Sequence, residues 1–137
     1  MTNAPTDVAT RFYELFGRGD IDGIIDLLGD GYESHGFGGG GPENLRQSLH
    51  GLRNAIPDIA FTVEDTITEG DKVAVKTTFR GTHRGPFAGV AATGNAVEVG
   101  SCDVFRVRDG RIVEGWYLGD SGTFLMQIGA LPMPTHA

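Results

Sequence analysis

The chain has 137 residues, of which 39% are hydrophobic and only one is cysteine, and its net charge is −7. This length favours one domain, with a core over about 6–130, and the single cysteine excludes an internal disulfide framework and a cysteine-based zinc site. The acidic charge without a basic run argues against nucleic acid and anionic membranes as partners. Without a signal-peptide pattern or a bilayer-length apolar run, we expect a cytoplasmic protein.

Three helices are predicted in the first part of the chain. Apolar residues at helical spacing predict the first over about 6–17, with Thr6 as its cap. Asp20 is expected to cap a short second helix. Pro42 suits the first turn of a third helix, which Pro57 ends. The first part of the chain is therefore predicted to be helical, apart from a short extended stretch between the second and third helices.

After the third helix the apolar pattern changes from helical to alternating, which predicts antiparallel strands. Hairpin turns are expected at Gly70-Asp71 and Asp109-Gly110. Helices followed by a strand meander indicate an α+β fold, in which three N-terminal helices pack in a curved, mainly antiparallel sheet. A terminal helical turn is expected over 124–128.

Alternation also predicts which side chains of the strands face the helices. In the first strand of the meander these are Ile59, Phe61, Val63 and Ile67. In the last strand they are Ile112, Glu114, Trp116, Leu118 and Asp120. The opposite face, expected to carry Cys102, Val104 and Tyr117, is left without cover, so we expect a homodimer that buries it.

Asp120 is the first candidate for a chemical group. It lies four residues after the lone Trp116, and in a strand the two share a face. A carboxylate beside a large apolar ring is desolvated, which raises its pKa and suits proton exchange near neutral pH. The alternative is that Asp120 only caps a helical turn that starts at Ser121.

Other polar residues have both a functional and a structural interpretation. His35 either polarises a substrate carbonyl or is a half-buried structural histidine. Asp103 is either a second pocket carboxylate or a buried hydrogen-bonding anchor. His83 lies on a loop, where a structural role is the alternative to pocket lining. Tyr32 either closes the pocket or fills the core.

No cofactor or metal is expected. No spacing of His, Asp or Glu favours a metal site. The run over 36–41 matches a dinucleotide-binding glycine pattern, but two helices precede it and antiparallel hairpins follow, so the required strand–helix–strand unit is missing. We interpret this run as a flexible lip over a pocket.

Four segments, 56–65, 69–75, 81–87 and 105–114, together with the order of the elements, resemble the SnoaL-like polyketide cyclase family. This family belongs to the nuclear transport factor two-like superfamily. The resemblance extends from about residue 8 to residue 129. It implies a single SnoaL-like domain with a cone-shaped α+β barrel and a dimeric assembly.

The resemblance also implies site residues. The acid/base aspartate of the family falls on Asp120, its histidine or asparagine on the short strand falls on His35, and its Gly-Thr-His loop falls on His83. Many members have Glu-His-Trp where this chain has Glu114-Gly115-Trp116, so one imidazole is missing here.

Residues and resemblance together predict a cofactor-independent cyclase or isomerase for a hydrophobic, carbonyl-containing small molecule, such as a polyketide intermediate. Asp120 would take or return a proton, while His35, with Asp103 or His83, would hold the carbonyl oxygen. The expected lining of the substrate site is Tyr32, Phe61, Phe79, His83, Phe87, Phe105 and Trp116. An epoxide hydrolase that uses Asp103 as a second acid and a non-catalytic binding or dimerisation module are the alternatives.

Overall fold

The computed structural model describes residues 4–132, in which four helices accompany a five-stranded sheet. The helices are α1 (Pro5–Gly17), α2 (Ile21–Asp26), α3 (Pro42–Ala55) and α4 (Ser121–Gln127). The strands are β1 (Leu28–His35), β2 (Ala60–Glu69), β3 (Lys72–Thr82), β4 (Ala96–Arg108) and β5 (Arg111–Trp116). None of these helices is long and apolar enough to cross a membrane.

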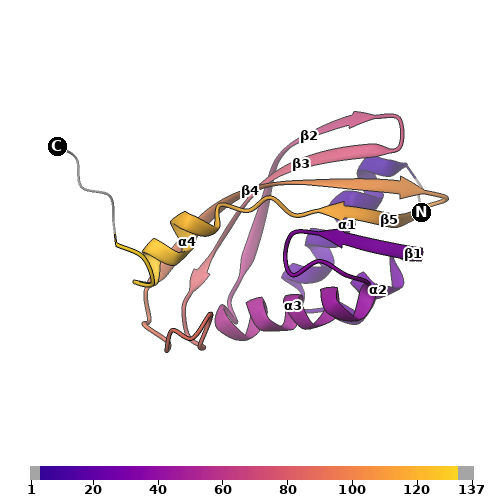
Figure 1. The fold of residues 1–137 in the computed structure, drawn as a ribbon. Coiled ribbons are helices and arrows are strands. Elements are labelled where there is room, and N and C mark those ends of the chain that lie inside the picture. Colours follow the sequence, from indigo (N-terminus) through magenta and orange to yellow (C-terminus); the bar gives the residue numbers. More distant parts are fainter. Residues whose placement is uncertain (1–3, 133–137) are drawn as a thin grey trace.

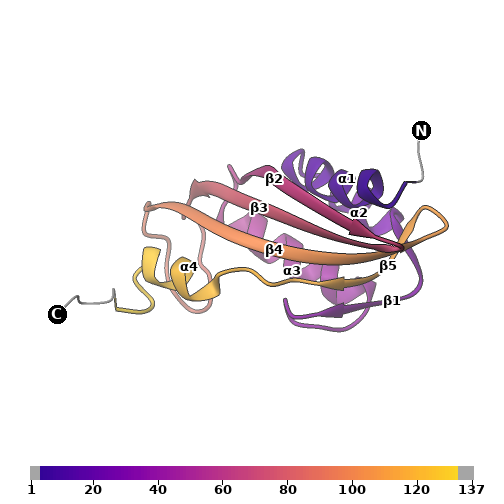
Figure 2. The ribbon, with the colours of Figure 1, turned by 90° about the horizontal axis from the view of Figure 1, so that it is seen from above.

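The strands are ordered β1-β5-β4-β3-β2, with β1 parallel to β5 and the other pairs antiparallel. Figures 1 and 2 show α1, α2 and α3 gathered on one side of the curved sheet. We call the sheet face toward these helices the inner face, and the opposite one the outer face. The predicted α+β fold and both predicted hairpins are confirmed.

Local sequence explains where the helices begin. Asp20 caps α2 as predicted, because its Oδ1 accepts a hydrogen bond of 2.8 Å from the backbone N–H of Gly23. Pro42 stands in the first turn of α3, where its missing N–H costs nothing. The predicted cap of α1 is wrong: the helix starts at Pro5, which places Thr6 inside its first turn.

The core lies between the helices and the inner face. Its most deeply buried side chains include Phe16 of α1, Leu45 and Leu49 of α3, Phe105 of β4 and Ile112 of β5. These residues come from the two predicted periodic patterns, helical in the first part of the chain and alternating in the second. Burial of this apolar surface supplies the main favourable free energy of folding.

A β-bulge in β5 inverts the predicted faces of that strand. Val107 pairs with Ile112, but Arg106 pairs with Glu114, so β5 contains one unpaired residue, Val113. Beyond Val113, every side chain of β5 points to the face opposite to the one that strict alternation predicts. Glu114 and Trp116 therefore lie on the outer face, and the prediction that they share a face with Ile112 is wrong.

A second bulge has the same effect in β2. Val63 pairs with Thr77 while Asp65 pairs with Lys76, which leaves Glu64 as the extra residue. Ile67 consequently lies on the outer face, where its side chain is 68% exposed. Its predicted position among the core residues is wrong for this reason.

Candidate active site

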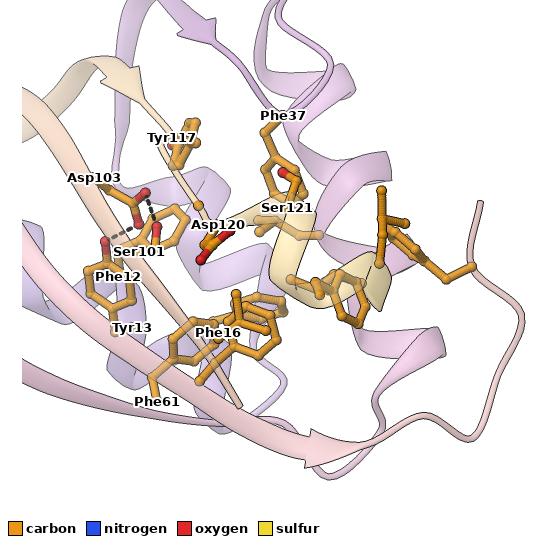
Figure 3. A pocket seen from close by; sticks show the side chains of 18 of the residues that line it. Phe12, Tyr13, Phe16, Phe37, Phe61, Ser101, Asp103, Tyr117, Asp120 and Ser121 are labelled. Carbon is orange, nitrogen blue, oxygen red and sulfur yellow. Dashed lines mark hydrogen bonds between the residues drawn. The ribbon is translucent and has the colours of Figure 1, made fainter. Parts of the chain in front are cut away.

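A cavity of about 300 Å³ lies between the inner face and helices α1, α3 and α4 (Figure 3). Most of its lining is apolar and aromatic. The aromatic lining residues are Phe12, Tyr13, Phe16, Phe37, Phe61, Phe79, Phe87, Tyr117 and Phe124. Its polar side chains come from Ser101, Asp103, Asp120 and Ser121. A concave apolar site with few polar groups is typical of a small-molecule pocket.

Asp103 is the buried carboxylate of this cavity, with only 6% of its surface exposed. The Tyr13 hydroxyl donates a hydrogen bond of 2.6 Å to Oδ2, and the Ser101 hydroxyl donates one of 2.7 Å to Oδ1 (Figure 3). The backbone N–H of Leu118 also donates to Oδ1, at 3.1 Å. Burial raises the pKa of Asp103, although these three hydrogen bonds oppose the rise. Asp103 thus has the desolvated environment that the sequence predicted for Asp120.

Asp120 lines the same cavity but is exposed to solvent, which places it at the opening. It caps α4: Oδ1 accepts from the backbone N–H of Thr123 at 3.1 Å and Oδ2 from its hydroxyl at 2.7 Å. These hydrogen bonds lower the pKa of Asp120. The prediction of a raised pKa is wrong, and the capping alternative describes the geometry.

His35 and Trp116 lie together on the outer face, away from the cavity. They are paired across β1 and β5, and their rings stack with centroids 5.1 Å apart. His35 Nε2 is also 2.7 Å from Oε2 of Glu114, and this hydrogen bond lowers the pKa of that carboxyl group. The predicted arrangement, with Trp116 beside Asp120 and His35 across the cavity, is wrong because the bulge turns this part of β5 outward.

The other predicted residues divide into two groups. Phe61, Phe79 and Phe87 line the cavity as predicted. Phe105, Tyr32 and His83 are buried but do not belong to the lining.

Each of these three has a structural neighbour instead. The Phe105 ring packs 5.3 Å from that of Phe12, and the Tyr32 hydroxyl lies 2.8 Å from Oγ of Ser34. In the loop after β3, His83 Nδ1 lies 2.9 Å from the hydroxyl of Thr93.

Several lining residues carry no functional signal in the sequence. Phe12 and Phe16 belong to the helically spaced apolar residues that predict the first helix, and they lie both in the core and in the cavity lining. Tyr13 lay outside that stripe and carried no other signal. Tyr117 was predicted on the uncovered face, and only the unpaired Val113 explains why it lies inside. No group of three or more His, Cys, Asp or Glu side chains within 4–132 could hold a metal ion.

The profile of the SnoaL-like polyketide cyclase family matches residues 6–128, and the chain belongs to this family. No protein with a curated description matches the chain. Among solved structures, AclR from Streptomyces galilaeus, provisionally called a hydroxylase, is 26% identical with a TM-score of 0.88, over 96% of this chain and 84% of AclR.

IdmH from Streptomyces antibioticus, provisionally called a polyketide cyclase, is 34% identical with a TM-score of 0.80, over 92% of this chain and 99% of IdmH. A protein from Jannaschia sp. CCS1, provisionally called a SnoaL-like polyketide cyclase, is 26% identical with a TM-score of 0.83, over 93% of both chains. These likenesses extend over nearly the whole chain.

Proposed function

We propose that the protein is a cofactor-independent cyclase or isomerase that transfers a proton within a hydrophobic, carbonyl-containing substrate of the polyketide type. We further propose that it acts in the cytoplasm, in secondary metabolism. The observation that carries the proposed reaction is a pair of carboxyl groups in one aromatic cavity, of which Asp103 is buried and Asp120 is exposed at the opening. The pKa of Asp103 is accordingly raised and that of Asp120 is lowered. Such a pair provides a base and an acid at the same pH.

Asp120 is the proposed base. Its lowered pKa keeps it ionised across the neutral range, so it is ready to accept a proton. Its position at the opening lets it pass that proton to water or return it to the substrate. A carboxylate with a low pKa is a weak base, however, so the carbon–hydrogen bond next to the substrate carbonyl must be activated by a second group.

Asp103 is the proposed activating acid. Its pKa is already raised, and a bound substrate would exclude the remaining water and favour the neutral carboxyl form further. A neutral Asp103 can donate a hydrogen bond to the carbonyl oxygen as that oxygen gains negative charge. Tyr13 and Ser101 hold the carboxyl group in a fixed orientation. Asp103 thereby takes the role that the sequence suggested for His35.

In the proposed reaction the carbon–hydrogen bond breaks, the proton passes to Asp120, and the electron pair forms an enolate whose oxygen is bound by Asp103. The enolate carbon then attacks a second carbonyl of the same substrate, which closes a ring, and the resulting alkoxide takes up the proton from Asp120. Alternatively, Asp120 returns the proton at another carbon, which gives an isomer. The aromatic lining holds the substrate folded and excludes water.

The test is deuterium incorporation into 2-tetralone, an aromatic ketone with acidic α-hydrogens, followed by NMR in D2O. We expect the protein to accelerate exchange, and Asp120→Asn to lower the rate by about 10²-fold or more. Asp103→Asn should lower it by about 10–10³-fold, because it removes the acidic donor. Asp30→Asn, at an exposed position of β1, is the matched control.

Two results would contradict this proposal. If 2-tetralone binds but its exchange is not accelerated, the result contradicts catalysis and supports the alternative of a non-catalytic binding module. If exchange is accelerated equally by the parent protein and by both variants, these two carboxyl groups are not the acid and the base.

We also propose a homodimer formed through the outer face. Cross-strand pairing places Ile67, Ala74, Val104 and Trp116 in one row across β2, β3, β4 and β5. No helix of the described chain covers this row, and an exposed apolar row on a sheet favours association with a second copy.

A further inference from the structure

Helix α4 forms one wall of the cavity and is too short to hold this position alone. Its residues Ser121, Phe124 and Leu125 belong to the lining. The Phe124 ring lies 6.0 Å from that of Phe79 and 4.9 Å from that of Phe87, measured between centroids. Because a helix of seven residues is only marginally stable in water by itself, α4 depends on bonds to the rest of the chain.

Gln127, the last residue of α4, makes two such bonds to the backbone of β4. Its Oε1 accepts a hydrogen bond of 2.9 Å from the backbone N–H of Glu98, and its Nε2 donates one of 2.8 Å to the Glu98 carbonyl oxygen. A side-chain amide can donate and accept at once, as a peptide group does. The amide of Gln127 therefore pairs with Glu98 in the way that a residue of a neighbouring antiparallel strand would.

The edge of β4 shows what this pairing replaces. The segment after β5 follows β4 as far as Gly100, whose carbonyl oxygen accepts a hydrogen bond of 3.0 Å from the backbone N–H of Asp120. The chain then enters α4, and two residues nearer the start of β4 the amide of Gln127 bonds to Glu98. Figures 1 and 2 show α4 beside this end of β4. The helix is thus attached to β4 at both of its ends.

The position of α4 affects two other parts of the site. At its end, the Asn95 side chain donates a hydrogen bond of 3.0 Å to the backbone carbonyl oxygen of Gln127, which joins α4 to the loop that carries Phe87. At its start, Thr123 donates both its backbone N–H and its hydroxyl to the carboxylate of Asp120. A displaced α4 would therefore disturb the aromatic wall and the orientation of Asp120 together.

We propose that Gln127 is a positioning residue, whose side-chain amide holds α4 on β4 and thereby keeps the aromatic wall and the Asp120 carboxylate in place. The part that concerns Asp120 rests on the proposed function. Gln127 does not belong to the cavity lining, so it acts through Phe124 and Thr123. The role requires a side chain that donates and accepts at the same time.

The test is the release of naphthalene, an apolar aromatic ligand, measured by stopped-flow fluorescence. Gln127→Ala removes both hydrogen bonds to Glu98, so α4 should separate from β4 more readily. We expect naphthalene to dissociate about 5–30-fold faster from this variant than from the parent protein. Gln47→Ala, at an exposed position of α3, is the matched control and should leave the dissociation rate unchanged.

Gln127→Glu separates positioning from a general loss of structure. Near neutral pH its carboxylate accepts but cannot donate, so it loses the bond to the Glu98 carbonyl oxygen and places a negative charge against it. The protonated carboxyl group donates and accepts, as the amide does. As pH falls from 7 toward the ordinary glutamate pKa of about 4.3, naphthalene release from this variant should approach the parental rate, while Gln127→Ala stays fast. Comparison of the three proteins at each pH removes the effect of groups that titrate in all of them.

Three results would overturn the inference: naphthalene does not bind to the parent protein, Gln127→Ala releases it at the parental rate, or Gln127→Glu remains as fast as Gln127→Ala at pH 4. Naphthalene has no carbonyl group and undergoes no proton transfer. If the naphthalene results are as expected but the parent protein does not accelerate 2-tetralone exchange, the proposed function fails while the role of Gln127 in the cavity wall stands.

Discussion

Two aspartates in one cavity differ because of their immediate neighbours. Asp103 is surrounded by protein and receives the Tyr13 hydroxyl from a helix 90 residues away in sequence. Asp120 receives its hydrogen bonds from Thr123, within the same helical turn, and is open to water. The sequence identified both as candidates and offered the local cap at Asp120 as an alternative, but the distant neighbour Tyr13 that donates to Asp103 is set by the tertiary fold.

The raised pKa of Asp103 predicts a pH-dependent cost to stability. Below the unfolded-state pKa of about 3.9 both states are protonated. As pH rises from the unfolded-state pKa to the higher folded-state pKa, the carboxyl group ionises in the unfolded state first. The folded protein therefore loses stability over this interval. The Asp103→Asn variant has no carboxyl group at this position, so it lacks this pH-dependent loss of stability. Measured by urea denaturation, the stability of the parent relative to the variant should fall as pH rises over this interval and then level off.

The control for this comparison is Asp30→Asn, at an exposed position. A parent protein that instead gains stability over Asp103→Asn as pH rises would show that the folded state favours the ionised carboxylate. The role of Asp103 as an acid in the proposed reaction would then fail.

At the scale of elements, the sequence predicted which segments form helices and strands better than which faces they present. Both hairpins and the three N-terminal helices were predicted from turn residues and periodicity, which are local properties. The faces of β2 and β5 were not, because one unpaired residue, Glu64 or Val113, inverts the alternation. A bulge depends on pairing with the next strand, and nothing local at Glu64 or Val113 indicated one.

The loop after β3 approaches the end of α3 very closely, and this contact predicts a stability change. A Cβ atom at Gly85 would lie 2.2 Å from the backbone carbonyl oxygen of Asn54, so the backbone would have to move. We expect Gly85→Ala to lower the free energy of unfolding by about 1–3 kcal/mol. Because the same loop carries Phe87 into the cavity, binding of 2-tetralone should weaken too.

Gly51→Ala is the matched control. Gly51 lies within α3, and a Cβ atom there would meet nothing within 4 Å. This substitution should raise the free energy of unfolding by about 0.5–1 kcal/mol, because alanine favours a helix interior over glycine. If urea denaturation shows equal effects for both variants, close contact is not what requires glycine at position 85.

For the whole molecule, the two faces of the sheet have different roles. The inner face holds the core and the cavity, while the outer face carries the apolar row defined above and a hydrogen-bonded polar cluster of His35, Glu114, Arg106 and Asp71. Trp116, which the sequence suggested as part of the substrate site, belongs to the outer face. Its position is better suited to contact with a second copy of the chain.

The proposed dimer predicts that light scattering at micromolar concentration returns twice the mass of the chain. Val104 lies in the middle of the apolar row, between Ala74 and Trp116. Val104→Lys would place a charge at the centre of the interface and should yield monomers. Lys76→Glu, which alters a charge on the same face but adds none to the row, is the control. A parent protein of monomer mass would refute the dimer.

The unpaired Val113 also bears on how sequences of this kind change. Deletion of this one residue would restore strict alternation in β5 and rotate the following segment by one position. Trp116 would then turn toward the helices, and Tyr117 would turn away from them. A single lost codon would thus replace the phenol by an indole and expose the former lining residue, a change in chemistry that no single substitution at either position can make. We therefore expect chain length at this point, and not only residue identity, to change the cavity lining.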